Sequence, residues 1–377
     1  MQFRDLQRQY EKLKDSIDKS IAEVLFSAHF ISGEQVTALE NTLDDYVGVK
    51  HCITCGNGTD AISIALMAWG IGSGDAVFVP DFTFFSSGEC PAAIGATPVF
   101  VDVKKETYNL DPEALEQEVK KVLTDGRYKP RAVIGVDLFG LPAEYKAIRR
   151  ICDKYHLLLL EDGAQGFGGR IGEKRACSFG DISTTSFFPA KPLGCYGDGG
   201  AIFTDDDMLA ERMRSIAVHG KNREDKYDNI RLGMNSRLDT LQAAVLQQKL
   251  QAFKDYELDD VNKAAELYTK CLSGVSGLIL PTVTEGYYSS WAQYTIQLSQ
   301  DIDRTAMQER LKAQGIPTMI YYTKPMHKQG AFQGTYSAEA NCPVTEELCN
   351  RVLCLPIHPY LAEEEIEKVA EALKQGL

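Results

Sequence analysis

The sequence predicts an α/β protein with a largely parallel sheet, followed by a smaller C-terminal α+β domain. The main observation is that, from Lys50 onward, short apolar runs alternate with segments of helical periodicity. Such alternation is typical of βαβ units, whose helices cover both faces of a parallel sheet. A second observation is that the pattern becomes rich in strand-forming residues after Gly277. We therefore expect a large α/β domain with N-terminal helices over residues 1–250 and a small domain over residues 251–377.

The composition is that of a soluble globular protein and argues against a nucleic-acid or membrane partner. The 377 residues are 44% hydrophobic and 25% charged, with a formal net charge of -13. A nucleic acid or an anionic membrane would require a basic surface instead. The polar N-terminus has no apolar segment of signal-peptide type, and no apolar run approaches membrane-spanning length. We therefore expect a cytoplasmic protein, whose ten cysteines do not form a disulfide framework.

Two amphipathic helices are predicted at the N-terminus. Apolar residues of the first recur at every fourth position, and the second ends near Gly48. The first carries Leu13, Ile17, Ile21 and Leu25, and the second carries Val36, Leu39 and Leu43.

Five apolar runs and four helical patterns then follow in alternation. The runs are at 51–55, 77–80, 98–103, 132–138 and 157–160, and the helices are at 60–68, 86–94, 111–123 and 142–155. The third helix has a clear start, because Asp111 can cap it and Pro112 suits its first position. A long helical stretch at 237–271 leads to the C-terminal region. There we expect a strand at 291–298 and helices at 303–314 and 363–373.

A glycine-rich segment follows the first predicted strand and opens a helix. It reads Gly56-Asn57-Gly58-Thr59-Asp60-Ala61 and fits the G-x-G-x-x-A pattern of dinucleotide-binding sites. Such sites also need an acidic residue that ends the second strand, and here Pro80 makes a poor ribose-binding terminus. The free N–H groups of a helix N-terminus still suit a phosphate. We favour a phosphate site over a connection without a ligand, and the latter over a dinucleotide site.

Cys52 and Cys55 form a C-x-x-C pattern, which also occurs in redox and zinc sites. Residues three apart in a strand point to opposite faces, an arrangement that suits neither a disulfide nor metal chelation. We expect two buried thiols and no metal site.

Two carboxylates, Glu161 and Asp162, follow the apolar run at 157–160. They lie where a parallel strand ends, at the edge where α/β sheets bind ligands. One acid there could pair with the protonated ring nitrogen of an electron-sink cofactor. The alternative is that the acids cap a helix or form ion pairs, and for Glu161 we expect that alternative.

One lysine, Lys191, lies in a Gly/Pro-rich loop between predicted strands at 183–188 and 201–204. Pro189 and Pro192 restrict the backbone on either side of it. Such a frame suits a lysine that forms an imine with a cofactor, because that amine must be fixed in place and partly desolvated. A tight hairpin whose lysine points to water is an equally good interpretation of this segment.

Five motifs occur along the chain in a fixed order. They are G-N-G-T-D-A at 56–61, D-F-T-F-F-S-S at 81–87, E-D-G-A-Q at 161–165, S-F-F-P-A-K-P-L-G-C-Y-G-D-G-G-A at 186–201 and M-N-S-R-L-D-T-L-Q-A-A at 234–244. Together they resemble the DegT/DnrJ/EryC1/StrS family of pyridoxal-phosphate (PLP)-dependent nucleotide-sugar aminotransferases. The resemblance covers nearly the whole chain and implies fold type I, with a seven-stranded, largely parallel sheet sandwiched by helices. One departure is Gly163, where alanine is usual.

The resemblance implies a role for each matching residue. Lys191 would form the internal aldimine with PLP, and Asp162 would pair with the pyridinium nitrogen. The other cofactor contacts would be Gln165 near the ring hydroxyl, Phe84 stacked on the ring, Gly58, Thr59 and Ser186 at the phosphate, and Asn235 at the phosphate of the neighbouring subunit.

Three further residues are expected to face the sugar. Arg237 matches a position that meets a sugar carboxylate in one branch of the family, and Tyr321 and His327 match the segment near the substrate. Arg237 could instead form a salt bridge at a helix start. Tyr321, Tyr322 and His327 could instead pack the domain interface.

The branch that the motifs resemble most aminates UDP-2-acetamido-2-deoxy-3-oxo-glucuronate. The resemblance therefore predicts a homodimer with shared active sites that uses L-glutamate, releases 2-oxoglutarate and serves surface polysaccharide or lipopolysaccharide O-antigen synthesis. Alternatives are an aminotransferase for a dTDP- or UDP-4-keto-6-deoxy sugar, a nicotinamide oxidoreductase and a regulatory protein. A PLP-dependent sugar dehydratase is a further alternative, which Lys191 weakens because dehydratase relatives carry histidine there.

Overall fold

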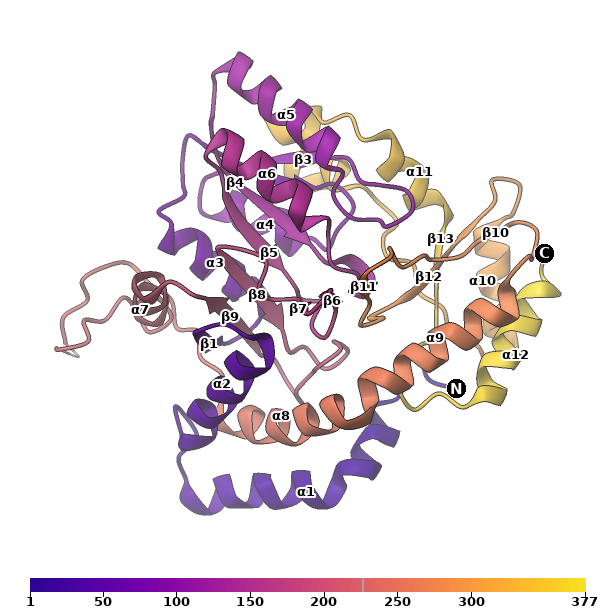
Figure 1. Cartoon of the computed structure of the whole chain (residues 1–377), viewed down its shortest axis with the longest axis horizontal. Coiled ribbons are helices and arrows are strands. Elements are labelled where there is room, and N and C mark those ends of the chain that lie inside the picture. Colours follow the sequence, from indigo (N-terminus) through magenta and orange to yellow (C-terminus); the bar gives the residue numbers. More distant parts are fainter. Residues whose placement is uncertain (226) are drawn as a thin grey trace.

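A seven-stranded sheet forms the centre of the computed structural model, which describes residues 1–225 and 227–377 (Figure 1). The strand order is β1-β9-β8-β5-β4-β2-β3. The strands are β1 (His51–Cys55), β2 (Asp75–Pro80), β3 (Thr97–Val101), β4 (Lys129–Val136), β5 (Leu158–Asp162), β8 (Ile182–Ser186) and β9 (Gly200–Thr204). Within this described sheet only β9 runs antiparallel to its neighbours. The predicted largely parallel sheet is confirmed.

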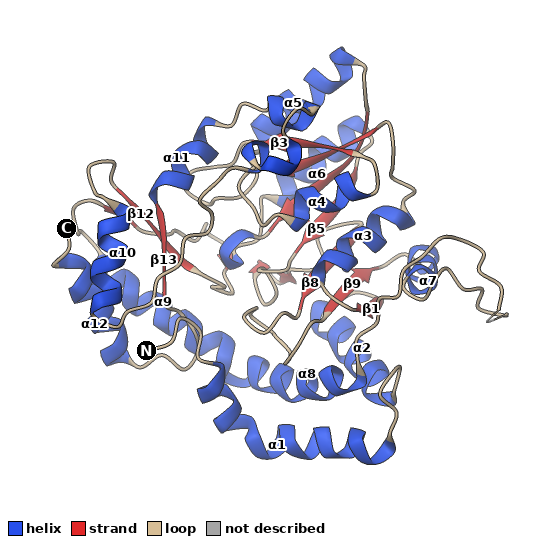
Figure 2. Ribbon diagram, turned by 180° about the vertical axis from the view of Figure 1, so that it is seen from behind, coloured by secondary structure: helices blue, strands red, loops and turns tan. Residues whose placement is uncertain are grey.

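Helices cover both faces of the sheet, as Figure 2 shows from the opposite side. They are α1 (Leu6–Ser27), α2 (Glu34–Val47), α3 (Gly58–Ala68), α4 (Ser86–Ala93), α5 (Pro112–Asp125), α6 (Tyr145–Tyr155), α7 (Asp207–Ile216) and α8 (Thr240–Ala252). Alternate residues of a central strand enter different cores. Val77 and Val79 pack with α3, whereas Phe78 packs with Leu115 of α5 and Ile148 of α6. Burial on both faces explains why these strands are almost continuously apolar.

A smaller sheet, β10-β12-β13, lies at the C-terminal end of the chain. Its elements are β10 (Leu278–Ile279), β12 (Tyr294–Leu298) and β13 (Val352–Leu355), with α9 (Leu258–Leu272), α10 (Arg304–Ala313) and α12 (Glu363–Lys374) packed against them. The expected domain boundary at residue 250 falls inside α8. From there a π-helical turn, Phe253–Glu257, connects α8 to α9, which contributes Tyr268 to the small core.

Most predicted elements are present within a few residues of their expected bounds. The apolar stripe of the predicted first helix, which is α1, is only partly buried. Ile17 and Val24 are buried, whereas Leu25 is 56% exposed. A spacing of four residues overshoots a helical turn of 3.6 residues by about 40° at each step, so the stripe rotates away from the core.

The long helix predicted at 237–271 differs from the observed structure. There the helical stretch begins at Thr240, and the π-helical turn divides it into α8 and α9. The elements missed were α7, α11 (Pro343–Arg351), β13 and the short strands β6 (Arg170–Ile171), β7 (Lys174–Arg175), β10 and β11 (Tyr287–Tyr288). Among the described helices, none combines the length and apolar character needed to cross a membrane.

Candidate active site

The carboxyl ends of the parallel strands bring the predicted motifs to one edge of the sheet. Helix α3 starts just after β1, Asp162 is the last residue of β5, and Ser186 is the last residue of β8. Since β1, β8 and β5 lie close together in the sheet order, three motifs separated by long stretches of chain meet there.

The N-terminus of α3 lies directly against the end of β8. Asn57 caps the helix, and its side-chain oxygen accepts a hydrogen bond of 2.8 Å from the N–H of Asp60. A Cβ atom on Gly58 would lie 2.8 Å from the Cβ of Ser186, so only glycine allows this approach. The hydroxyls of Thr59 and Ser86 form a hydrogen bond of 2.7 Å, which holds the Thr59 side chain in place. The free N–H groups of this turn and two nearby hydroxyls form a cradle suited to phosphate.

Asp162 is a buried carboxylate held in place by two donors. The hydroxyl of Ser87 donates a hydrogen bond of 2.8 Å to one oxygen, and the N–H of Ala164 donates one of 3.2 Å to the other. Burial raises the pKa of Asp162, while these hydrogen bonds and the charge of Lys191 act in the opposite direction. A cationic ring nitrogen placed here would meet a fixed, desolvated anion.

Lys191 lies in the loop between β8 and β9, which pair as an antiparallel hairpin. Its N–H donates to the carbonyl of Phe188 at 2.8 Å, and its Nζ lies 6.0 Å from the centroid of the Phe84 ring. Burial lowers the pKa of this amine, although the charge of Asp162 raises it. The hairpin is therefore present, and its lysine is partly exposed and near enough to Asp162 for the two charges to interact.

Glu161 has a structural role, although with partners other than the expected ones. Its oxygens accept hydrogen bonds from the N–H groups of Cys177 and Phe179 and from the hydroxyl of Ser183. It also faces the buried Asp137, and burial together with the charge of Glu161 raises the pKa of Asp137 well above its ordinary value. Glu161, which is next to Asp162 in the chain, and Asp137 thus form a buried acid pair at the carboxyl ends of β5 and β4.

Gln165 and Phe84 both contact Tyr322. The amide of Gln165 donates a hydrogen bond of 3.3 Å to the Tyr322 hydroxyl and accepts one of 2.9 Å from the N–H of Phe139. The rings of Phe84 and Tyr322 have centroids 6.5 Å apart. Phe84 remains 53% exposed, which leaves its ring able to contact a ligand. Tyr322 therefore joins the C-terminal segment to two of the motifs that are expected to bind the cofactor.

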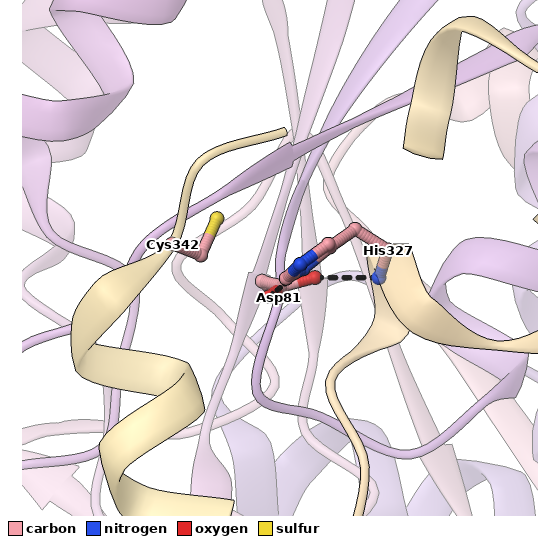
Figure 3. Close-up of side chains that lie close together, drawn as sticks. All are labelled: Asp81, His327 and Cys342. Atoms are coloured by element: carbon pink, nitrogen blue, oxygen red, sulfur yellow. Dashed lines mark hydrogen bonds and ion pairs between the residues drawn. The ribbon is translucent and has the colours of Figure 1, made fainter. Parts of the chain in front are cut away.

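His327 points at Asp81 (Figure 3). Its ring Nδ1 lies 2.6 Å from an Asp81 oxygen, its backbone N–H donates to the other at 2.8 Å, and its Nε2 lies 3.4 Å from Glu346. Both ring nitrogens therefore face carboxylates, and the expected contact with a sugar stays a prediction that these surroundings do not support. Cys342 completes a buried group of potential metal ligands, but the carboxylate and imidazole are already paired with each other.

The segment around Asn235 lies beside the start of α3. Ser236 accepts a hydrogen bond of 2.9 Å from the N–H of Gly56 and donates one of 2.6 Å to Asp60. Asn235 is exposed and Arg237 is partly exposed.

The third residue expected at the sugar, Tyr321, is half-buried, with its ring centroid 6.5 Å from that of Phe3. Sequence reasoning missed Ser87 and Arg4 as neighbours of the site. Ser87 could have been found inside the D-F-T-F-F-S-S motif. Nothing near Arg4 in the sequence indicates its hydrogen bond to the backbone carbonyl of Lys191.

Cys52 and Cys55 are free and buried, as predicted. They enter different cores, Cys52 with α2 and Cys55 with α3, because they lie on opposite faces of β1.

Comparisons with known proteins agree with this geometry. Residues 11–374 match the model of the DegT/DnrJ/EryC1/StrS aminotransferase family. The chain is 44% identical over 373 residues to the UDP-2-acetamido-2-deoxy-3-oxo-D-glucuronate aminotransferase of Pseudomonas aeruginosa, with 99% of each chain covered. It is 42% identical to a protein of Geobacillus stearothermophilus named pleiotropic regulatory protein, with 97% of each covered.

A crystal structure of a DegT DnrJ EryC1 StrS aminotransferase from Brucella abortus superposes on the chain with a TM-score of 0.96 and 44% identity. The superposition covers 100% of this chain and 99% of that one. The chain therefore belongs to the DegT/DnrJ/EryC1/StrS family and is a PLP-dependent sugar-nucleotide aminotransferase.

Proposed function

We propose that the enzyme converts UDP-2-acetamido-2-deoxy-3-oxo-glucuronate to the 3-amino sugar, with L-glutamate as amino donor and 2-oxoglutarate as the second product. The observation that carries the proposal is the meeting of Lys191, Asp162 and the α3 N-terminus at one sheet edge. The choice of sugar is supported by the similarity to the Pseudomonas aeruginosa enzyme. We place the reaction in the cytoplasm, in the synthesis of a surface polysaccharide such as an O-antigen.

The residues at this edge fit PLP. The cradle of Gly58, Thr59 and Ser186 would hold the phosphate, and Asp162 would meet the ring nitrogen. Phe84 would lie against the ring, and Gln165 would lie near the ring hydroxyl, where its amide already bonds Tyr322. When bound, PLP supplies an electron sink that stabilises negative charge on the carbon next to the amine.

Lys191 would attach PLP and, once displaced by the amino donor, carry a proton between the two carbons that exchange it. An amine does this best when its pKa is near the working pH, because it must both accept and release the proton. Burial lowers the pKa of Lys191 in that direction. Asp162 would stay charged beside the ring nitrogen and keep it protonated.

The substrate would be held by Arg237, Tyr321 and, less directly, His327. Arg237 is partly exposed at the segment that touches α3, where its planar guanidinium could bind the sugar carboxylate with two parallel hydrogen bonds. Tyr321 lies next to Tyr322, which contacts both Phe84 and Gln165. His327 would act by holding Asp81, three residues before Phe84.

The test is a reaction of the purified protein with L-glutamate and UDP-2-acetamido-2-deoxy-3-oxo-glucuronate. We expect equal amounts of 2-oxoglutarate and of a UDP-sugar whose mass matches replacement of the ketone oxygen by an amine. A dTDP- or UDP-4-keto-6-deoxy sugar serves as the comparison. A preference for that sugar would refute the uronate assignment, and loss of a hydroxyl without glutamate would indicate a dehydratase.

We further propose that the enzyme is a homodimer in which Asn235 reaches the phosphate site of the partner subunit. Its support is the exposure of Asn235 next to Ser236, together with the resemblance of the N-S-R-L-D segment. Lys191→Ala and Asn235→Asp should each be nearly inactive, the latter because a carboxylate would oppose the phosphate.

When the two inactive variants are unfolded and reassembled together, mixed dimers should regain activity. The subunit that keeps Lys191 would then receive an intact Asn235 from its partner. If mixed dimers form without activity, Asn235 acts within its own chain.

A further inference from the structure

The first residues of the chain contact the loop that carries Lys191. We call residues 3–5 the N-terminal strap. The Nη2 atom of Arg4 donates a hydrogen bond of 2.7 Å to the carbonyl of Lys191 and one of 3.3 Å to the carbonyl of Pro192. Because 187 residues separate Arg4 from Lys191, this contact exists only in the folded protein.

The strap is also fixed to the C-terminal part of the chain. The ring of Phe3 packs edge-on against Tyr321, with centroids 6.5 Å apart. Asp5 caps α1 by accepting a hydrogen bond of 3.0 Å from the N–H of Arg8. The side chain of Arg8 in turn donates to the carbonyl of Tyr360 at 3.1 Å and pairs with Glu365 at 2.7 Å. Arg4 is therefore held between the lysine loop and C-terminal residues that include Tyr321 and Tyr360.

Arg4 adds a positive charge to the surroundings of Lys191. Burial lowers the pKa of the Arg4 guanidinium to about 10, and Glu257 opposes that effect. Glu257 is itself buried and bonded to Gln9 at 2.7 Å and to Tyr360.

The charge of Arg4 also acts on two further basic groups. The charge of Arg4 helps to lower the pKa of Lys249 to about 8 and that of His358 to about 4, in each case after burial. The charges of Arg4 and Asp162 act on the Lys191 amine in opposite directions, because Arg4 lowers its pKa and Asp162 raises it.

We infer that Arg4 is a positioning residue for Lys191: its two hydrogen bonds fix the backbone of the loop from which the amine projects. The inference rests on the proposed role of Lys191 as the PLP-bearing residue. One guanidinium nitrogen of the partly buried Arg4 reaches two successive carbonyls, and a planar, charged group can hold both. Its positive charge acts at a partly buried position and lowers the pKa of the Lys191 amine, which disfavours a second positive charge there.

The experiment compares Arg4→Gln, Arg4→Lys and Arg8→Gln in the full chain. Arg4→Gln removes the charge, and Arg4→Lys keeps the charge but not the planar donor geometry. Arg8→Gln is the matched control, because it loosens the same strap without touching the lysine loop. Two pH profiles are measured for each protein: the visible absorbance of the PLP-loaded enzyme, and the rate of Lys191 acetylation by acetic anhydride after PLP removal, followed by mass spectrometry.

In Arg4→Gln we expect the midpoints of both profiles to move to higher pH. The unprotonated fraction at a fixed pH below the midpoint should fall by about three- to tenfold, since one pKa unit is a factor of ten. Arg4→Lys should keep the wild-type midpoints but lower kcat with little change in KM, because the lysine backbone is less firmly held. Arg8→Gln should keep both the midpoints and kcat.

Unchanged midpoints in Arg4→Gln, with PLP still attached to Lys191, would overturn the inference and leave the proposed function intact. If Arg4→Gln does not fold, unchanged kcat in Arg4→Lys would overturn the positioning role. Failure of the wild-type protein to attach PLP at Lys191 would instead refute the proposed role of the lysine.

Discussion

Replacement of Asp162 by asparagine tests the central electrostatic feature of the site. The side chain keeps its size, its single oxygen can still accept the 3.2 Å hydrogen bond from the N–H of Ala164, and its NH2 group can donate to the hydroxyl of Ser87, which lies 2.8 Å from the other oxygen of Asp162. What it loses is the negative charge, in a position that is buried from water. The variant should therefore fold and bind PLP but leave the ring nitrogen without its anion.

The size of the effect follows from the charge and the burial. Two opposite unit charges about 4 Å apart contribute about 4 kcal/mol at an effective dielectric constant of about 20. If most of this interaction supports proton transfer, the rate falls by about 10³, because each 1.36 kcal/mol corresponds to about tenfold. Ser87→Ala is the matched control. It removes one hydrogen bond but no charge, and we expect a loss of about tenfold.

The assay is a single turnover with L-glutamate, followed through the change in PLP absorbance as the amino group is transferred. PLP content is measured separately, so that slow chemistry is distinguished from poor cofactor binding. A rate for Asp162→Asn within tenfold of the wild type would show that another carboxylate meets the ring nitrogen. A loss in Ser87→Ala as large as that in Asp162→Asn would show that position, and not charge, is decisive.

Three further predictions concern single side chains. Borohydride should fix PLP to Lys191, and peptide mapping that finds it on another lysine would refute the mechanism. Arg237→Lys should weaken binding of a uronic-acid ketosugar much more than that of its 6-deoxy analogue, because lysine lacks the planar fork; equal losses would favour a neutral sugar. The hydrogen bond to Asp81 raises the pKa of His327 above its ordinary value, although burial opposes it, and Cys342, Glu346 and Lys328 lie nearby. The His327–Asp81 pair should therefore stabilise the fold fully below a pH of about 6.5 and lose that contribution as pH rises through the folded-state pKa of His327. Between pH 6 and 9, the free energy of unfolding measured with urea should decrease more for the wild type than for His327→Gln. Parallel curves would show that the pair does not titrate in this range.

The sequence by itself determined the fold class and the main parts of the site. Strand and helix periodicity arise from local backbone geometry, so the alternation after Lys50 was sufficient to predict a parallel sheet covered by helices. In such a sheet the carboxyl ends of strands lie at one edge, which brings Asp162 and the α3 N-terminus together. Lys191 needed the motif resemblance as well, because its loop was equally compatible with a solvent-facing hairpin.

Only the tertiary structure decided which residues surround these parts. His327 lies 246 residues from Asp81 in the chain, and Arg4 lies 187 residues from Lys191, so no local pattern indicates either contact. The exposure of Leu25 in α1 has a related reason, because the residue spacing specifies a helix but the packing partner selects its buried side. Periodicity depends on neighbours along the chain, whereas hydrogen bonds, burial and the resulting pKa shifts depend on neighbours in space.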